Sequence, residues 1–172
     1  MKNTVILIGG PPASGKSSLA ESISKELQIL HIDIDEFVKN ERLDPDGPDK
    51  WKLFFKKYLS YLENNESIIV SATFREEKTR HDFYKTAKLL KYNIHLIFLN
   101  APSLILYKRY ESRPAEKHFV NQDNGRDKLS NWMNKFSQQN NYDLGKEWTV
   151  YDSHLLDQET LKNIIIQNIK IQ

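Results

Sequence analysis

The sequence predicts an α/β protein built on a parallel sheet, and three observations lead to this class. Short runs rich in β-branched residues alternate along the 172 residues with segments of helical period. A glycine-rich stretch separates the first such run from the first helical segment. Polar and charged side chains follow several of the runs, at the sheet edge where α/β proteins bind their ligands.

Each element follows from its own local pattern. Apolar β-branched runs predict strands at 4–8, 30–34, 67–72, 94–99 and 147–151. Apolar residues at i, i+3, i+4 and i+7 predict helices at 16–27, 50–64, 76–91, 102–112, 127–138 and 157–170. Pro45, Gly47 and Pro48 predict a loop, and the polar stretch 114–125 is predicted to be irregular. Because helices that connect parallel strands cross over the sheet, we expect both faces to be covered.

Composition sets the broad class. Hydrophobic residues make up 39% and charged residues 28%, so we expect a single domain over residues 1–172. The net charge of +2 argues against a nucleic-acid partner. The absence of cysteine excludes disulfides and thiolate metal sites, and His31, His81 and His95 have no metal-site spacing. Without a leader or a membrane-length apolar run, we expect a cytoplasmic protein, as a monomer or homodimer.

Residues 9–18 carry the strongest motif, Gly-Gly-Pro-Pro-Ala-Ser-Gly-Lys-Ser-Ser, which from Gly10 fits G-x-x-x-x-G-K-S. Its place between a strand and a helix is that of a phosphate-binding loop, and argues against a chance Gly-Pro turn. Glycines let backbone N–H groups turn inward, and the helix N-terminus adds positive charge. Lys16 can then reach the β- and γ-phosphates, and the Ser17 hydroxyl can bind Mg²⁺. The predicted nucleotide-binding residues are Gly10, Pro11, Pro12, Ala13, Ser14, Gly15, Lys16, Ser17 and Ser18.

Two carboxylates follow the second predicted strand. Asp33 and Asp35, at i and i+2, would point to the same face of an extended segment. We predict that Asp33 holds Mg²⁺ through water and that Asp35 accepts the proton of an attacking hydroxyl. Glu36 is either a solvated neighbour or shares the role of Asp35. The alternative is that these acidic residues cap the next turn.

Small polar and basic side chains follow the third strand. Ser71 and Thr73 suit a hydroxylated substrate or metal-bound water, and Arg75 or Arg80 can neutralise a substrate carboxylate or phosphate. The alternative is that Ser71 or Thr73 caps the following helix. No aspartate closes this strand, which argues against a motor-type ATPase and favours a small kinase.

Two arginines lie four residues apart after the fourth strand. Arg109 and Arg113 would share a helical face and clamp a transferring γ-phosphoryl group, unless they form a solvated basic face. The polar segment 113–127 is predicted to be a lid that excludes water. Its His118 either contacts substrate or anchors the lid. Residues 151–154 either border an adenine or form an Asx turn.

Together these motifs resemble the small P-loop kinases of the nucleoside-monophosphate-kinase-like group, such as gluconate kinases and shikimate kinases, over nearly the whole chain. The loop from Gly10, the Asp33 and Asp35 pair and the two arginines match that group, and residues 71–75 are similar to a gluconate kinase segment. The resemblance implies a three-layer P-loop NTPase fold with a lid. Its five-stranded parallel sheet would have the order 2-3-1-4-5. ATP and Mg²⁺ would be the cofactors.

The activity that the resemblance implies is that of an ATP-dependent kinase. The γ-phosphoryl group would pass to a hydroxyl of a small polar metabolite, as in gluconate kinases. The gluconate kinases' Gly-Asp-x-x-His segment is absent, so the reaction carries over and the acceptor does not. Residues 33–37 also resemble polynucleotide 5′-hydroxyl kinases and zeta-toxin-type sugar-nucleotide kinases. A hypothesis of another class is a non-catalytic ATP-binding regulatory module.

Overall fold

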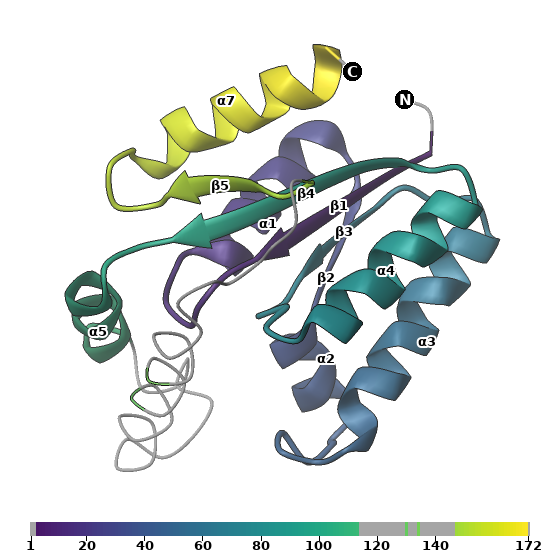
Figure 1. The fold of residues 1–172 in the computed structure, drawn as a ribbon, viewed down its shortest axis with the longest axis horizontal. Coiled ribbons are helices and arrows are strands. Elements are labelled where there is room, and N and C mark those ends of the chain that lie inside the picture. Colours follow the sequence, from purple (N-terminus) through teal and green to yellow (C-terminus); the bar gives the residue numbers. More distant parts are fainter. Residues whose placement is uncertain (1–2, 114–129, 131–133, 135–146, 172) are drawn as a thin grey trace.

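The computed structural model describes residues 3–113, 130, 134 and 147–171, which form a parallel sheet with helices on both faces (Figure 1). The strands are β1 (Thr4–Gly9), β2 (Leu30–Asp33), β3 (Ile68–Ser71), β4 (Asn93–Asn100) and β5 (Thr149–Asp152). The helices are α1 (Lys16–Leu27), α2 (Ile34–Asn40), α3 (Asp49–Glu63), α4 (Glu77–Leu89), α5 (Ser103–Glu111) and α7 (Gln158–Ile171). The strand order is β2-β3-β1-β4-β5, and all neighbouring strands are parallel. The predicted α/β class and strand order are confirmed.

The central strand β1 divides the core into two layers. Its side chains alternate between the faces of the sheet, so Val5 and Leu7 pack with α3 and α4, while Ile6 and Ile8 pack with α1 and α7. All four are completely buried. A strand that is apolar on both faces can only lie inside such a sandwich. The loop after β1 therefore starts from a fully buried strand at the centre of the sheet.

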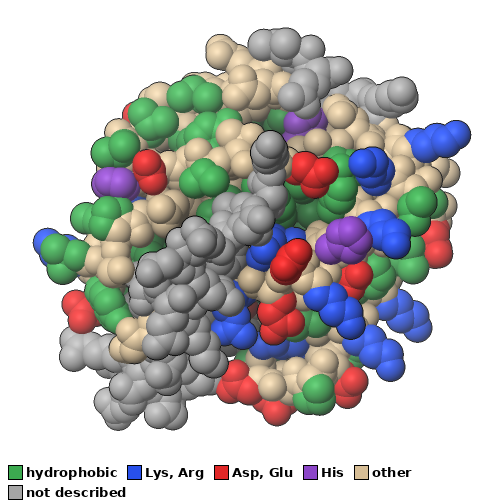
Figure 2. Space-filling model, in the orientation of Figure 1, with side chains coloured by type: hydrophobic (Ala, Val, Ile, Leu, Met, Phe, Trp, Pro, Cys, Tyr) green, Lys and Arg blue, Asp and Glu red, His purple; other side chains and the backbone are tan. Residues whose placement is uncertain are grey.

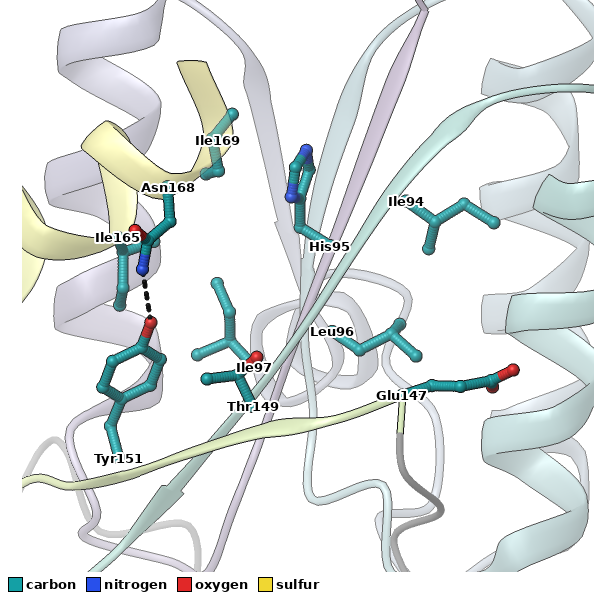
Figure 3. A pocket seen from close by; sticks show the side chains of 10 residues that line it. All are labelled: Ile94, His95, Leu96, Ile97, Glu147, Thr149, Tyr151, Ile165, Asn168 and Ile169. Carbon is teal, nitrogen blue, oxygen red and sulfur yellow. Dashed lines mark hydrogen bonds between the residues drawn. The ribbon is translucent and has the colours of Figure 1, made fainter. Parts of the chain in front are cut away.

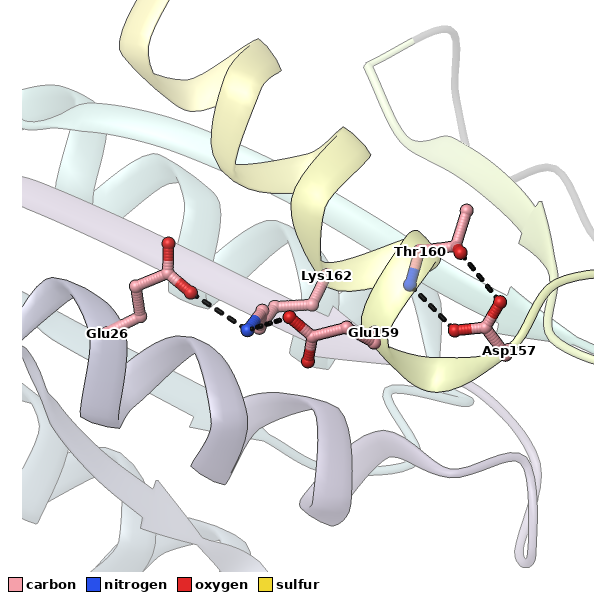
Figure 4. Close-up of polar contacts among 5 residues, drawn as sticks. All are labelled: Glu26, Asp157, Glu159, Thr160 and Lys162. Carbon is pink, nitrogen blue, oxygen red and sulfur yellow. Dashed lines mark hydrogen bonds and ion pairs between the residues drawn. The ribbon is translucent and has the colours of Figure 1, made fainter.

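Helix α7 braces α1, which begins at that loop (Figure 4). Lys162 Nζ of α7 lies 2.9 Å from Glu26 Oε2 of α1 and 2.7 Å from Glu159 Oε1. The Asp157 carboxylate accepts from the Thr160 amide at 2.9 Å and from its hydroxyl at 2.6 Å, which caps the start of α7. Apolar residues of both helices share one core cluster. These contacts fix the direction in which α1 approaches the sheet edge.

An aromatic cluster holds α3 and α4 on the other face. Tyr58 stacks on Phe83 with ring centroids 4.6 Å apart, and its hydroxyl donates to the Phe83 carbonyl at 3.0 Å. Burial raises the pKa of Tyr58 above its usual range. Trp51 and Phe74 extend the cluster toward the end of β3. The aromatic residues of α3 thus pack in the hydrophobic core, as their helical spacing indicates.

The structure differs from several of the predicted elements. Helix α2 was not predicted, and the strand expected over 30–34 ends at Asp33, because Asp33 accepts hydrogen bonds from the next amides and starts a helix. Strand β5 pairs with β4 over 149–152 rather than 147–151. The segment predicted to be irregular over 114–125 lies outside the described residues, and so does the predicted lid apart from Arg113. Most of the helix predicted over 127–138 also lies outside them, although Ser130 and Asn134 are helical. Among the described helices, none has the length and apolar character of a membrane span.

A pocket of about 250 Å³ lies between β4, β5 and α7, on the amino-terminal half of β4 (Figure 3). Its polar lining includes His95, Tyr151 and Asn168, and the Asn168 amide donates to the Tyr151 hydroxyl at 3.2 Å. The His95 side chain is buried, and Asn93 Nδ2 donates to its Nε2 at 3.1 Å. Burial lowers the pKa of His95 below its usual value. None of these residues belongs to the glycine-rich loop at the other end of the sheet.

The lowered pKa of His95 makes stability depend on pH. Because the folded state resists protonation of His95, the unfolded state binds more protons as pH falls below 6.5, and stability decreases. Chemical denaturation at about pH 7.5 and about pH 5.5 should show this loss. It should be smaller in His95→Gln than in the unchanged protein. The exposed His81 provides the control His81→Gln, which should keep the full loss. An equal loss in His95→Gln would contradict the prediction.

Candidate active site

The glycine-rich loop connects β1 to α1 at the carboxyl edge of the sheet. Gly10 (φ 143°), Ala13 (φ 64°) and Gly15 (φ 96°) all have positive φ. Gly15 is the N-cap of α1, and this helix start has neither a side-chain cap nor an acidic residue in its first turn. The first amides of a helix need acceptors, so this terminus suits a phosphate group. The conformation is that of a phosphate-binding loop.

Two glycines of the loop are needed for different reasons. A Cβ on Gly10 would lie 2.3 Å from the Leu99 carbonyl oxygen, whereas one on Gly15 would meet no atom within 4 Å. Gly15→Ala should therefore cost only backbone strain, about 1 kcal/mol of unfolding free energy. Gly10→Ala adds a backbone clash and should cost about 3 kcal/mol. Urea unfolding of both variants measures the difference, and equal losses would contradict this account.

Lys16 closes the loop from the start of α1. Its Nζ donates to the Pro11 carbonyl at 2.9 Å. Burial lowers the pKa of Lys16, while Asp35 and Asp33 oppose this shift and Arg113 adds to it. Ser14, also in the loop, is buried, and its hydroxyl has no hydrogen-bond partner among the described residues. The loop thus holds a partly desolvated cation and an unsatisfied hydroxyl close to the helix terminus.

Asp33 is the centre of a hydrogen-bond network at the end of β2. Its Oδ2 accepts from Ser17 Oγ at 2.8 Å and from Ser71 Oγ at 2.5 Å. Its Oδ1 accepts from the amides of Asp35 at 2.8 Å and Glu36 at 3.2 Å. Asp33 is 6% exposed. It therefore orients the Ser17 hydroxyl and caps α2 at once, so the capping alternative is confirmed for this residue.

The oxygen atoms of Ser17 and Asp33 are the kind that Mg²⁺ prefers. In the described part of the chain, no group of three or more histidine, aspartate or glutamate side chains could hold a metal ion. Mg²⁺ bound with a nucleotide takes few protein ligands besides phosphate oxygens and water, so this donor set fits it. The Ser17 hydroxyl would be the direct ligand of Mg²⁺, and Asp33 would orient that hydroxyl through its hydrogen bond.

His31 contacts this network, whereas the sequence analysis considered it only as a possible metal ligand and found no metal-site spacing. Its Nε2 lies 2.8 Å from Ser71 Oγ. Because Ser71 donates its single hydrogen to Asp33, it accepts from His31, so Nε2 carries a hydrogen. Burial lowers the pKa of His31, which Asp33 opposes. The i, i+2 spacing of His31 and Asp33 on one strand was the available signal.

Asp35 lies in the first turn of α2, so the expected pair on one face of an extended segment is wrong. Its side chain is accessible, yet protein surrounds it closely enough that desolvation raises the pKa of its carboxyl, with a further rise from Asp33. Lys16, Lys50 and Arg113 oppose that rise. Lys50, from the first turn of α3, was not anticipated; its Nζ donates to the Pro45 carbonyl. Figure 2 shows acidic and basic side chains side by side where β1 and β3 end.

The two arginines after β4 do not share a helical face, because α5 ends at Glu111 and Arg113 follows it. Arg109 donates to Ser153 Oγ at 3.0 Å and to the Ser153 carbonyl at 2.7 Å, which ties α5 to the turn after β5. That turn is a backbone turn, with the Leu155 amide donating to Asp152. Arg113 acts on the pKa values of both Lys16 and Asp35. Of the pair, Arg113 lies beside the phosphate loop.

The candidate substrate residues of the β3–α4 segment differ in placement. Ser71 belongs to the Asp33 network, and Thr73 is half-buried. Neither caps α4, whose N-cap is Glu76, so that alternative is wrong. Arg75 pairs with Glu76 at 3.7 Å. Arg80 is buried and donates to backbone carbonyls of its own segment. His118 lies outside the described residues.

Comparison with known proteins agrees with this geometry. The family profile AAA_33, described as an AAA domain, matches residues 5–141. The chain belongs to this family. An L-seryl-tRNA(Sec) kinase of Methanococcus maripaludis is 28% identical over 114 residues, 61% of this chain and 44% of the relative. The chain thus spans less than half the length of that curated relative.

Solved structures share the fold at low identity. A shikimate kinase of Bacteroides thetaiotaomicron has a TM-score of 0.72 at 12% identity, covering 97% of this chain and 98% of its own. A gluconokinase of Sinorhizobium meliloti has a TM-score of 0.65 at 16% identity, covering 98% and 93%. An APS kinase of Mycobacterium tuberculosis, in complex with AMPPNP and APS, has a TM-score of 0.66 at 14% identity, covering 99% of both chains. The expected resemblance to small P-loop kinases is confirmed.

Proposed function

We propose that this protein is an ATP- and Mg²⁺-dependent kinase that transfers the γ-phosphoryl group to a hydroxyl of a small polar metabolite. One observation carries the proposal: Lys16 of the glycine-rich loop, Asp33 hydrogen-bonded to the Ser17 hydroxyl, and the accessible Asp35 lie together at one sheet edge. Phosphoryl transfer needs little covalent chemistry from the protein. It needs these groups held in place.

Each residue has a role in this proposal. The loop amides and Lys16 bind the phosphates, and Arg113 stabilises negative charge on the transferring group. Ser17 and Asp33 would hold Mg²⁺, which neutralises phosphate charge when it is bound. Asp35 accepts the hydroxyl proton of the acceptor. The raised pKa of Asp35 brings its basicity closer to neutral pH, which favours proton acceptance.

Arg109 has another role in this proposal. Its two hydrogen bonds to Ser153 direct the guanidinium to the turn after β5. We assign it to the side of the nucleotide base, where it supports residues 151–154. The AMPPNP bound to the APS kinase neighbour supports adenine as the base.

A second candidate acceptor is a hydroxyl carried by a nucleic acid. The L-seryl-tRNA(Sec) kinase relative favours it, because that enzyme acts on a charged tRNA. Such an acceptor would be bound through phosphate contacts, and its binding would weaken steeply with salt. The net charge of +2 favours the small metabolite. The fold neighbours named above as shikimate kinase and gluconokinase favour it too.

The test is ADP release from Mg-ATP across a panel of acceptors, with Asp35→Asn as the control. The panel holds gluconate, shikimate, other sugar acids, nucleosides, sugar nucleotides, a 5′-hydroxyl oligonucleotide and seryl-tRNA. A rise with one acceptor that Asp35→Asn abolishes supports the kinase and names the acceptor class. ATP binding without a rise for any acceptor would favour the non-catalytic module instead.

A further inference from the structure

The turn between β3 and α4, residues 72–76, stands beside the phosphate-binding loop. Ser71 pairs with Ile8 in the β1–β3 register, and the Ala72 amide donates to the Ile8 carbonyl at 3.2 Å. Along the turn, Ala72 and Phe74 are buried, whereas Thr73 and Arg75 are half-exposed. The turn is therefore anchored in the core by alternate residues and presents the other two at the edge of the site.

Phe74 holds the turn in a strained conformation. Its φ is +43°, in the left-handed region that residues with a Cβ rarely adopt. The ring is completely buried, with its centroid 6.2 Å from that of Trp51, 5.3 Å from that of Phe83 and 5.8 Å from that of Trp148. Such strain persists only where surrounding contacts impose it. The ring packing supplies one such constraint.

Arg80 supplies a second constraint from the first turn of α4. Arg80 is 6% exposed. Its Nη1 donates to the Phe74 carbonyl at 2.9 Å and to the Arg75 carbonyl at 2.7 Å. These charge-assisted hydrogen bonds fix two consecutive peptide groups. A buried cation at the start of a helix opposes the helix dipole, so it needs such partners.

We propose that Arg80 is a positioning residue for acceptor binding, which holds the 72–76 turn so that Thr73 and Arg75 face the acceptor. The inference rests on the proposed kinase function and assigns the acceptor contacts within it. Arg80 itself then touches no substrate, in contrast to the role that the sequence predicted for it. Its effect reaches the acceptor through two backbone carbonyls.

Hydrogen exchange tests the positioning without any acceptor. In Arg80→Met, amides of the 72–76 turn should exchange at least about tenfold faster, because two charge-assisted hydrogen bonds are lost. Arg80→Lys should give an intermediate increase, since a lysine cannot reproduce the planar guanidinium geometry. The exposed Lys85 on the same helix provides the control Lys85→Met, which should leave the turn unchanged. Unchanged exchange in both Arg80 variants would overturn the proposal.

Kinetics with the acceptor found by the panel then separates positioning from general stability. In Arg80→Lys, the KM for the acceptor should rise about tenfold, while the Kd for Mg-ATP stays within about twofold of the unchanged protein. An unchanged acceptor KM, or an equal loss of Mg-ATP affinity, would overturn the role of Arg80. If Arg80→Met does not fold, Arg80→Lys decides. A failure of every acceptor with the unchanged protein would instead overturn the proposed function, and the acceptor role with it.

Discussion

Replacement of Lys16 by alanine is expected to lower turnover at least about a hundredfold. Lys16 is the cation that the phosphate loop places at the start of α1, and its Nζ already lies within the loop, 2.9 Å from the Pro11 carbonyl. In the proposed reaction it moves from this carbonyl to the phosphates. Its charge counts most where water is partly excluded, as the lowered pKa of Lys16 indicates.

The matched control is Lys25→Ala, because Lys25 is exposed in the last turn of the same helix. That variant should keep normal turnover and normal Mg-ATP affinity. Steady-state ADP release and nucleotide titration measure both quantities. Turnover in Lys16→Ala equal to that of Lys25→Ala would contradict the assigned role. A melting temperature close to that of the unchanged protein would show that the loss is chemical rather than structural.

Asp35→Asn is expected to reduce turnover by a similar factor, at least about a hundredfold, with little change in Mg-ATP affinity. The amide keeps the size of the side chain but cannot accept the hydroxyl proton. Glu36→Gln is the matched control, since Glu36 is exposed in the same turn of α2. It tests whether Glu36 shares the role of Asp35. A comparable loss in Glu36→Gln would assign the proton to the pair.

The dependence of turnover on pH gives an independent test of the role of Asp35. Asp35 must be deprotonated to act as a base, so the rate should fall as pH drops through the pKa of Asp35. Because desolvation by the surrounding protein and the charge of Asp33 raise the pKa of Asp35, the fall should begin at a higher pH than an ordinary aspartate would give. The residual rate of Asp35→Asn should lack this acid limb. An unaltered limb in that variant would assign the titration to another group.

The sequence predicted the sheet and the phosphate loop well because both depend on local patterns. Uninterrupted apolar runs identify buried parallel strands, and the order of strand, glycine loop and helix has few other meanings. Helix α2 was missed because the residues from Ile32 to Asp35 alternate apolar and acidic, which is a strand pattern. The decisive signal was the capping by Asp33, whose side chain accepts from the amides two and three residues on.

Tertiary contacts decided the rest of the site. Spacing placed Arg109 and Arg113 on one helical face, but α5 ends before Arg113, and Arg109 bonds to a turn 44 residues away. Arg80 looked like a substrate cation because its sequence position follows a strand end. Only the fold reveals that it is buried against backbone carbonyls. Local pattern cannot tell a cation that faces a ligand from one that faces the chain.

Several structural elements share the carboxylate of Asp33, and this restricts the substitutions that the sequence can accept. Asp33 takes hydrogen bonds from Ser17 on α1, from Ser71 on β3 and from two amides of α2. Replacement of Asp33 removes the acceptor of both hydroxyls, and replacement of either serine removes one donor from the buried Asp33 carboxylate. Substitutions at Ser17, Asp33 and Ser71 should therefore be strongly non-additive. Among descendants of this chain, these three positions are expected to change together or not at all.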